Sequence, residues 1–270
     1  MRNKSRKRIE MKRALIIGFS YRMEGYQDKV CIRNPHRELP GTIVDLYLAY
    51  TYFHSKGYDI SIMCDFRVTP RSITESILSG KIDVEILNFL EDQSHIIYNI
   101  RGIEDLCREL NNNCSKPYKT TVVYFSGHGI HNHLLLPNHE KISWNEFYSY
   151  IRDCYLGGCL YVILDCCHPS KLDLQYTFES GSFKENIIYR PSKSGNVSLI
   201  SVSGNNSVAL TSDSGSAFTR CFFRRLQKIF TTGFDFEEMK RMIEEDIYDM
   251  CSKRMVLHLH SSNTERYVSF

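Results

Sequence analysis

The sequence lacks long hydrophobic runs, internal repeats and low-complexity tracts. No apolar segment approaches the roughly 18 residues of a membrane-spanning helix, and the N-terminal segment has no apolar stretch like that of a secretory signal. Cysteine pairs at CxxC spacing and the HExxH pattern are also missing, which argues against the common zinc sites. These absences predict a cytoplasmic globular protein; a nuclear location is the alternative.

A basic segment at the N-terminus accounts for the net charge of +3. Residues 1–13 carry seven Lys or Arg and one acid, a charge of +6, so the remaining residues carry −3. Because the body is mildly acidic, no nucleic-acid partner is expected, and no membrane partner either. We interpret residues 1–11 as a basic disordered tail, with a nuclear-targeting or membrane-surface patch as the alternative.

The rest of the composition is that of an ordinary globular domain, with 42% hydrophobic and 24% charged residues. Ten cysteines in a chain of 270 residues without a signal sequence indicate free thiols in a reducing compartment, not a disulfide framework. Several of them lie within apolar patterns, and burial is expected for Cys64, Cys107, Cys159 and Cys221.

Strand and helix patterns alternate from residue 12 onward. Short apolar runs predict strands at 14–19, 59–64, 120–125, 160–164, 197–202 and 254–260. Amphipathic spacing predicts helices at 42–56, 101–111, 144–154, 216–230 and 236–250, with one or two more in 69–90. The segments expected to be loops are 20–40, 130–142 and 168–196. This alternation predicts one α/β domain, a mostly parallel six-stranded sheet with helices on both faces in a three-layer sandwich.

Two of the predicted strands end in reactive residues. The sequence YFSGHG closes the third strand at residues 124–129, and DCCH closes the fourth at 165–168. Ligands of open α/β sheets bind at the carboxyl ends of the strands, so His128 and a cysteine are expected to meet there. Adjacent strand residues point to opposite faces, so only one of the two cysteines can face such a site. A thiol beside an imidazole is a nucleophile with its base.

Two acidic residues are candidates for binding a substrate cation. Asp165 precedes the cysteine pair, and Asp45 lies in the first predicted helix. Such carboxylates are either solvated ends of elements or the floor of a pocket for an Arg or Lys side chain. The histidines of the run that starts at His128 lack the spacing of metal ligands, so no metal site is expected among His131, His133 and His139.

The order of these motifs resembles that of the metacaspases, which are caspase-fold cysteine peptidases of clan CD and peptidase family C14. YFSGHG and DCCH carry the resemblance, and it extends to ALIIGFSY, LPGTIVDLYLAY, SVSGNNSVALTSDSGSAFT and HLHSSN, and to Asp65 at the end of the second strand. It covers about residues 12–270. The resemblance implies a hydrolase, a cysteine-type endopeptidase (thiol protease) that cleaves proteins or peptides after Arg or Lys and is monomeric.

Roles for single residues follow from their positions in these motifs. The resemblance implies that Cys167 is the nucleophile and His128 its base. It implies a substrate pocket formed by Asp45, Ser126 and Asp165. The oxyanion of the intermediate is then expected to accept hydrogen bonds from the backbone N–H groups of Gly129 and Cys167.

The chain departs from the family pattern in three places. Thr42 stands where members commonly have Cys, and Pro169-Ser170 replaces Ser-Gly after the cysteine pair. Calcium-dependent members carry several acids after the His, whereas residues 130–150 contain only Glu140 and Glu146. Because Ca²⁺ takes about six to eight oxygen ligands, we expect no required cofactor and weak or absent activation by Ca²⁺.

The resemblance also divides the peptidase domain, residues 12–270. The part at 12–167 corresponds to a large subunit, the part at 197–270 to a small subunit, and the loop at 168–196 is a candidate processing site. Lys184 and Lys193 are the first candidates for self-cleavage in this loop.

Two alternatives remain beside the peptidase. One is a catalytically weak pseudopeptidase of the same fold, acting as an adaptor or decoy, which the Pro169 change and the missing acids suggest. The other is a different Cys–His hydrolase on an α/β sheet. The presence of His128 and Cys167 together with both pocket acids favours the peptidase.

Overall fold

The structure is a computed structural model. It describes residues 11–21, 38–65, 88–89, 97–113, 118–130, 132–153, 158–167, 176–179, 182–185, 196–204, 211–212, 214–228, 234–252, 255–262 and 267–268. Residues 1–10 of the predicted basic tail, most of the predicted helical region 69–90, and His131, Pro169 and Lys193 lie outside these residues.

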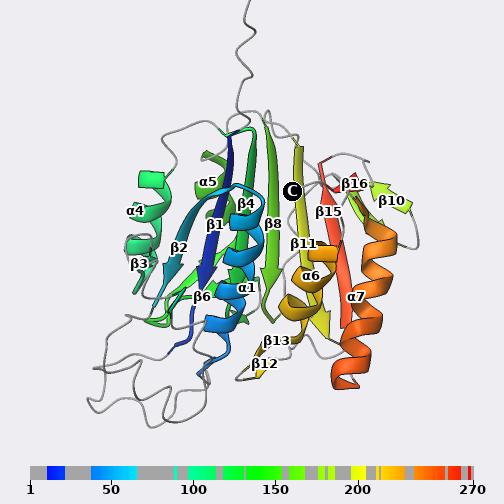
Figure 1. Cartoon of the computed structure of the whole chain (residues 1–270). Coiled ribbons are helices and arrows are strands. Elements are labelled where there is room, and N and C mark those ends of the chain that lie inside the picture. Colours follow the sequence, from blue (N-terminus) through cyan, green and yellow to red (C-terminus); the bar gives the residue numbers. More distant parts are fainter. Residues whose placement is uncertain are drawn as a thin grey trace, which may run out of the picture.

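A nine-stranded sheet in the order β10-β9-β15-β11-β8-β4-β1-β2-β3 forms the middle of the molecule (Figure 1). Six of its strands are mutually parallel: β1 (Lys12–Gly18), β2 (Asp59–Cys64), β3 (Ile97–Asn99), β4 (Thr120–Ser126), β8 (Cys159–Asp165) and β11 (Asn196–Gly204). The strand β15 (Met255–Ser261) runs antiparallel to β11. All six predicted strands are present, and the predicted fold class is confirmed.

The segment 168–196 contains regular structure that the sequence did not predict. Its strands β9 (Tyr176–Glu179) and β10 (Ser182–Glu185) form a hairpin, and β9 pairs with the last residues of β15. The prediction of a loop was wrong here, because strands of four residues owe their pairing to the sheet edge that they join and carry little pattern of their own. Lys184 lies exposed within β10.

The segment after His128 also differs from the predicted loop. It forms a small sheet of β5 (Gly129–Ile130), β6 (His133–Leu135) and β7 (Lys141–Ser143). Strands of two or three residues are too short to show alternation in a sequence. Two further short pairs are β12 (Thr211–Ser212) with β13 (Gly215–Ser216), and β14 (Phe234–Asp235) with β16 (Tyr267–Val268).

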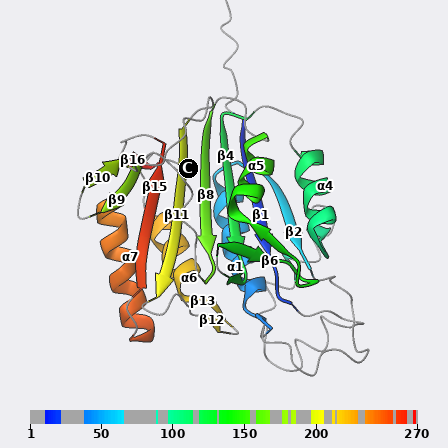
Figure 2. The ribbon, with the colours of Figure 1, turned by 180° about the vertical axis from the view of Figure 1, so that it is seen from behind.

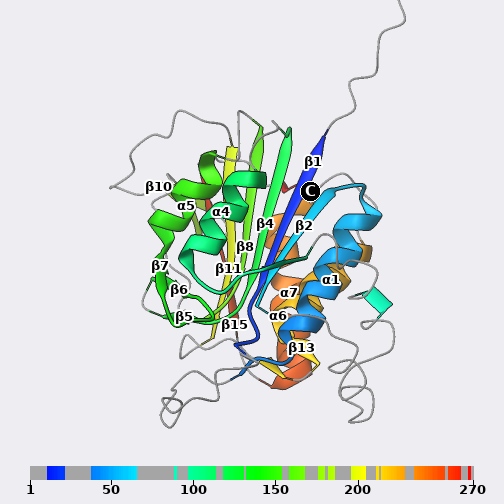
Figure 3. The same ribbon diagram turned by 90° about the vertical axis from the view of Figure 1, so that its left-hand side faces the viewer.

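Helices cover both faces of the large sheet. One face carries α1 (Thr42–Ser55), α6 (Ala217–Lys228) and α7 (Phe236–Cys251), which lie in front of the sheet in Figure 1. The other face carries α4 (Ile103–Asn113) and α5 (Trp144–Asp153), seen from behind in Figure 2. Figure 3 shows the resulting three layers edge-on. These helices lie within a few residues of the predicted ones.

The ends of two helices are capped by side chains. Ser143 precedes α5, and its Oγ accepts a hydrogen bond from the N–H of Glu146 at 3.2 Å. Asp235 caps α7 in the same way, through the N–H of Glu238. None of the helices in the described part of the chain is long and apolar enough to cross a membrane.

The burial predicted for the cysteines holds only in part. Cys64 and Cys221 are buried, but Cys107 and Cys159 are only half-buried. Cys159 is the first residue of β8, where the sheet ends, and Cys107 lies on α4 next to Tyr150. The apolar pattern around these two residues therefore identified the helix and the strand correctly but did not show that both residues lie where the core ends.

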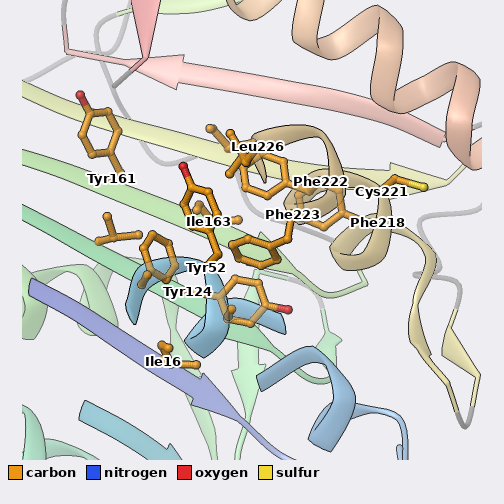
Figure 4. Packing of buried hydrophobic residues seen from close by; sticks show 14 of the residues in the cluster. Ile16, Tyr52, Tyr124, Tyr161, Ile163, Phe218, Cys221, Phe222, Phe223 and Leu226 are labelled. Carbon is orange, nitrogen blue, oxygen red and sulfur yellow. The ribbon is translucent and has the colours of Figure 1, made fainter. Parts of the chain in front are cut away.

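The face under α1, α6 and α7 is filled by aromatic rings around Phe223 (Figure 4). The Phe223 ring is 1% exposed. Its centroid lies between 5.4 and 5.7 Å from those of four other rings, which belong to Tyr52, Phe53, Tyr124 and Phe222. Because these rings come from α1, β4 and α6, Phe223 joins two helices to the centre of the sheet.

Removal of the Phe223 ring should lower the free energy of unfolding by about 3–5 kcal/mol, because its rigid neighbours cannot refill the cavity. The measurement is urea unfolding of Phe223→Ala, followed by far-UV circular dichroism. The matched control is Tyr248→Ala, since this ring is 50% exposed on α7; its loss should change stability by less than about 0.5 kcal/mol. Equal losses in both variants would contradict the central role of Phe223.

Candidate active site

The register of β4 and β8 brings the two reactive segments together. The strands are parallel, and their last paired residues are Ser126 and Asp165. Pairing continues one step further, because the N–H of Gly127 donates to the carbonyl of Asp165 at 3.2 Å. His128 and Cys167 each follow two residues beyond the Ser126–Asp165 pair. Both therefore lie at the edge of the sheet toward which the arrowheads of β4 and β8 point, beside β6 and β13 (Figure 1).

The two adjacent cysteines have different surroundings. Cys166 is completely buried in the core on the α4 and α5 side, and burial raises the pKa of its thiol well above the ordinary value. A thiol in that position stays neutral and unreactive. Cys167 is half-buried. The alternation along the chain thus leaves Cys167 as the more accessible thiol of the pair.

Gly129 allows the His128 segment to touch the cysteine segment. A β-carbon at this position would lie 2.0 Å from the carbonyl oxygen of Cys167 and 3.1 Å from the Sγ of Cys166. Any other residue would push the two strand ends apart. The backbones that carry His128 and Cys167 are therefore in direct contact.

A buried carboxylate from α1 reaches the tip of β4. The Asp45 side chain is 1% exposed; one of its oxygens accepts a hydrogen bond from the Ser126 hydroxyl and the other from the Ser216 N–H, both at 2.8 Å. Gly215 makes this approach possible, because its φ is +95° and a β-carbon there would lie 2.7 Å from the Asp45 carboxylate. Asp45 thus connects α1 to β4 and to the start of α6.

A second buried carboxylate, that of Asp165, belongs to the same group. Its Oδ2 accepts a hydrogen bond of 2.5 Å from the Thr219 hydroxyl, which in turn lies 2.5 Å from the hydroxyl of Tyr124. Two buried polar atoms of this group, Oδ1 of Asp165 and Oγ of Ser216, make no hydrogen bond of ordinary geometry within the described ranges. The Ser216 hydroxyl is nevertheless close enough to Asp165 to lower the pKa of that carboxyl.

Both carboxyl groups resist ionisation in the structure. Burial raises the pKa of Asp165 to about 6, although the hydroxyls of Ser216 and Thr219 oppose the rise. Burial also raises the pKa of Asp45, and the negative charge of Asp165 raises it further. Two acids buried together favour a cationic ligand, because only a positive charge satisfies them in their ionised forms.

Of the two acids after His128, Glu140 is bound to another element. Glu140 accepts a hydrogen bond of 2.8 Å from the N–H of Ile103 at the start of α4, and this bond lowers the pKa of the Glu140 carboxyl. Glu146 lies in the first turn of α5. Over the residues that the structure describes, no group of three or more His, Cys, Asp or Glu side chains is placed to hold a metal ion.

Several residues of this region were not singled out from the sequence. Ser216 and Thr219 lay within the quoted segment 201–219, but nothing there indicated that they contact the two acids. Thr219 is a polar residue on the buried face of α6, and this position was the signal that could have pointed to its role. Tyr21 likewise lay in the quoted motif ALIIGFSY without a role, and its hydroxyl accepts a hydrogen bond of 2.7 Å from the N–H of His128.

Comparison with known proteins matches the whole of this architecture. The family model of the caspase domain, Peptidase C14, covers residues 11–267. Among solved structures, 264 chains match. One of them is the crystal structure of a protein from Geobacter sulfurreducens, with a TM-score of 0.54 and 11% sequence identity, covering 94% of each chain. At that identity the similarity shows the fold alone. No curated protein matches the sequence.

The raised pKa of Asp165 predicts that this residue destabilises the fold at neutral pH. The folded-state pKa of about 6 exceeds the ordinary value of 3.8, so the contribution of Asp165 to stability falls as the pH rises through this window and stays low above it. The free energy of unfolding of Asp165→Asn should therefore exceed that of the wild type by on the order of 1–3 kcal/mol at pH 8, and by much less at pH 4.5. Urea unfolding at both pH values measures this difference.

The control for this experiment is Asp249→Asn, which removes an exposed carboxylate of α7. Its free energy of unfolding should equal that of the wild type at both pH values. A gain for Asp165→Asn that is the same at pH 4.5 and pH 8 would contradict the assignment to ionisation.

Proposed function

The chain belongs to the caspase-domain family of peptidases, and from this premise we propose that it is a cysteine endopeptidase of the metacaspase type that cleaves after Arg or Lys. The observation that carries the proposal is the position of the acid pair. Asp45 and Asp165 lie buried beside the strand ends that carry His128 and Cys167. A nucleophile next to a cation-binding group is the arrangement that cleavage after a basic residue requires.

Cys167 acts as the nucleophile in this mechanism. Its thiolate attacks the carbonyl carbon of the scissile bond, after the thiol proton has passed to His128. The carbon–nitrogen bond then breaks, and the imidazolium of His128 gives its proton to the leaving amine. The resulting thioester on Cys167 is hydrolysed by a water that His128 deprotonates, which releases the new carboxyl terminus and restores the thiol.

The oxyanion of the tetrahedral intermediate is assigned to the backbone N–H groups of Gly129 and Cys167. The β5–β6 ladder supports this role for Gly129. Because the Leu135 N–H donates to the carbonyl of His128 at 3.1 Å, hydrogen-bonded pairs of this antiparallel ladder fall at positions 128 and 130, and the N–H of Gly129 points away from β6. That N–H is therefore not used in the β5–β6 ladder.

The side chain of an Arg or Lys substrate is assigned to the acid pair. Asp45, Ser126 and Asp165 supply the acceptor oxygens. Oδ1 of Asp165 and Oγ of Ser216, which make no hydrogen bond of ordinary geometry among the described residues, are the positions for new hydrogen bonds. A guanidinium has five N–H donors and satisfies several such acceptors at once. Its charge also favours the ionised form of both carboxyl groups, so binding and ionisation reinforce each other.

We further propose that the activity needs no Ca²⁺ and that the enzyme acts as a monomer. The support for calcium independence is the engagement of Glu140 with the start of α4, since a carboxylate that caps a helix is occupied. Both points are open to direct measurement.

Peptide hydrolysis tests the proposal as a whole. Purified protein is expected to cleave fluorogenic peptides with Arg or Lys before the scissile bond, and not those with Asp, both with Ca²⁺ and with a chelator. Cys167→Ala should abolish cleavage, because it removes the nucleophile. The matched control Cys166→Ala should retain activity within a few-fold, because Cys166 faces the core. Absence of cleavage under all conditions would favour the pseudopeptidase.

Asp45→Asn tests the role of the acid pair in selectivity. The amide keeps the shape and can still accept from the Ser216 N–H, but it removes the negative charge. We expect kcat/KM for an Arg peptide to fall about 100-fold, corresponding to about 2.7 kcal/mol. A peptide with citrulline, the neutral analogue of Arg, should lose less than about threefold. Equal losses for both peptides would refute the assignment of Asp45 to the substrate cation.

A further inference from the structure

The backbone around His128 depends on contacts from outside its own segment. Gly127 and Gly129 flank this residue, and glycine is the residue whose backbone is least restricted. The two flanking glycines alone therefore do not fix the orientation of the His128 side chain. Several of its contacts come from Tyr21, which follows β1 in the sequence and lies more than one hundred residues away.

The Tyr21 hydroxyl takes the place of a backbone hydrogen bond next to His128. In a regular antiparallel pair, His128 and Leu135 would exchange two N–H to carbonyl bonds. One of these is present, from the Leu135 N–H to the His128 carbonyl. In place of the other, the His128 N–H donates to the Tyr21 hydroxyl at 2.7 Å, and this hydroxyl donates to the Leu135 carbonyl at 2.9 Å.

The backbone of Tyr21 is itself held in a strained conformation. Its φ is +58°, a region that bulky residues seldom adopt because it costs on the order of 1 kcal/mol or more. Asp65, at the end of β2, stabilises this turn. Its carboxylate accepts the N–H of Ser20 at 2.8 Å and that of Tyr21 at 2.6 Å.

The ring of Tyr21 also lies against the imidazole. The two ring centroids are 4.6 Å apart and the planes are inclined by 39°. Gly127 leaves room for this approach, since a β-carbon there would lie 2.8 Å from the Tyr21 hydroxyl oxygen. Burial raises the pKa of Tyr21 well above its ordinary value; the N–H of His128 opposes this rise and the charge of Asp65 adds to it, so the hydroxyl keeps its proton and remains a donor.

We propose that Tyr21 is a positioning residue for His128, held in place by Asp65, and that it orients the imidazole toward Cys167. The inference rests on the proposed function, in which His128 is the base of the dyad. It adds a residue from the segment after β1 to a dyad carried by the ends of β4 and β8. Strained conformations stabilised by their surroundings are a common feature of functional sites.

Tyr21→Phe tests the role of the hydroxyl, because it keeps the ring and removes both hydrogen bonds. We expect kcat for an Arg peptide to fall about 10- to 100-fold with KM changed less than about twofold, since misplacement of a catalytic group affects the chemical step. The matched control is Tyr58→Phe: the Tyr58 hydroxyl is buried without a hydrogen-bond partner among the described residues, and its loss should leave kcat unchanged. Thermal unfolding confirms that each variant folds.

Alkylation of Cys167 by iodoacetamide, measured by mass spectrometry against pH, tests the inference without a substrate. In the wild type, His128 should keep Cys167 reactive at low pH, as an imidazolium stabilises a thiolate. In Tyr21→Phe the reactivity profile should shift to higher pH, toward that of His128→Ala. Profiles that coincide for wild type and Tyr21→Phe overturn the inference, whether or not peptides are cleaved.

Failure of the proposed function gives a different result. A wild type that cleaves no Arg peptide, but whose Cys167 profile shifts in Tyr21→Phe, would refute the peptidase and retain the positioning role. If Tyr21→Phe does not fold, Asp65→Asn replaces it, because it releases the strained turn and leaves the Tyr21 ring intact. It should shift the Cys167 profile in the same direction, and an unchanged profile would overturn the inference.

Discussion

The parallel pairing of β4 with β8 is the constraint on which the rest of the site depends. The ladder ends with Ser126 opposite Asp165, and this register determines which face each later side chain occupies. A slip of one residue in β8 would exchange the faces of Asp165 and Cys166. The carboxylate would then enter the apolar core under α5, and a buried thiol would take its place beside Asp45. Register and chemistry are therefore linked at this edge of the sheet.

Tyr124 connects the acid pair, Asp45 and Asp165, to the aromatic core. Tyr124 packs its ring against Phe223, with centroids 5.5 Å apart, and its hydroxyl lies within hydrogen-bond distance of Thr219, which holds Asp165. The energy gained by packing these rings stabilises a region in which two carboxyl groups are buried at a cost. Under the proposed function, a substrate cation would remove part of that cost on binding.

The sequence was sufficient for the main elements and for the residues at the strand ends. Continuous apolar runs such as Val122–Phe125, closed by Gly or Asp, predict buried strands because few other structures tolerate them. The short strands of the segment 129–143 could not be predicted, since their pairing is decided by partners and not by pattern. Tyr21 escaped notice for a related reason: its contacts with His128 and Leu135 join three segments that only the folded chain brings together.

The acid pair draws its contacts from both sides of the segment 168–196. Asp45, Ser126 and Asp165 precede that segment, whereas the Ser216 N–H and the Thr219 hydroxyl follow it. The ladder between β8 and β11 and the packing of α1 on α6 also cross the division. A chain severed there would thus remain a single particle under native conditions and separate into two fragments only in denaturant. The N-terminal fragment on its own would retain both carboxylates but lack two of the hydrogen-bond donors that hold them.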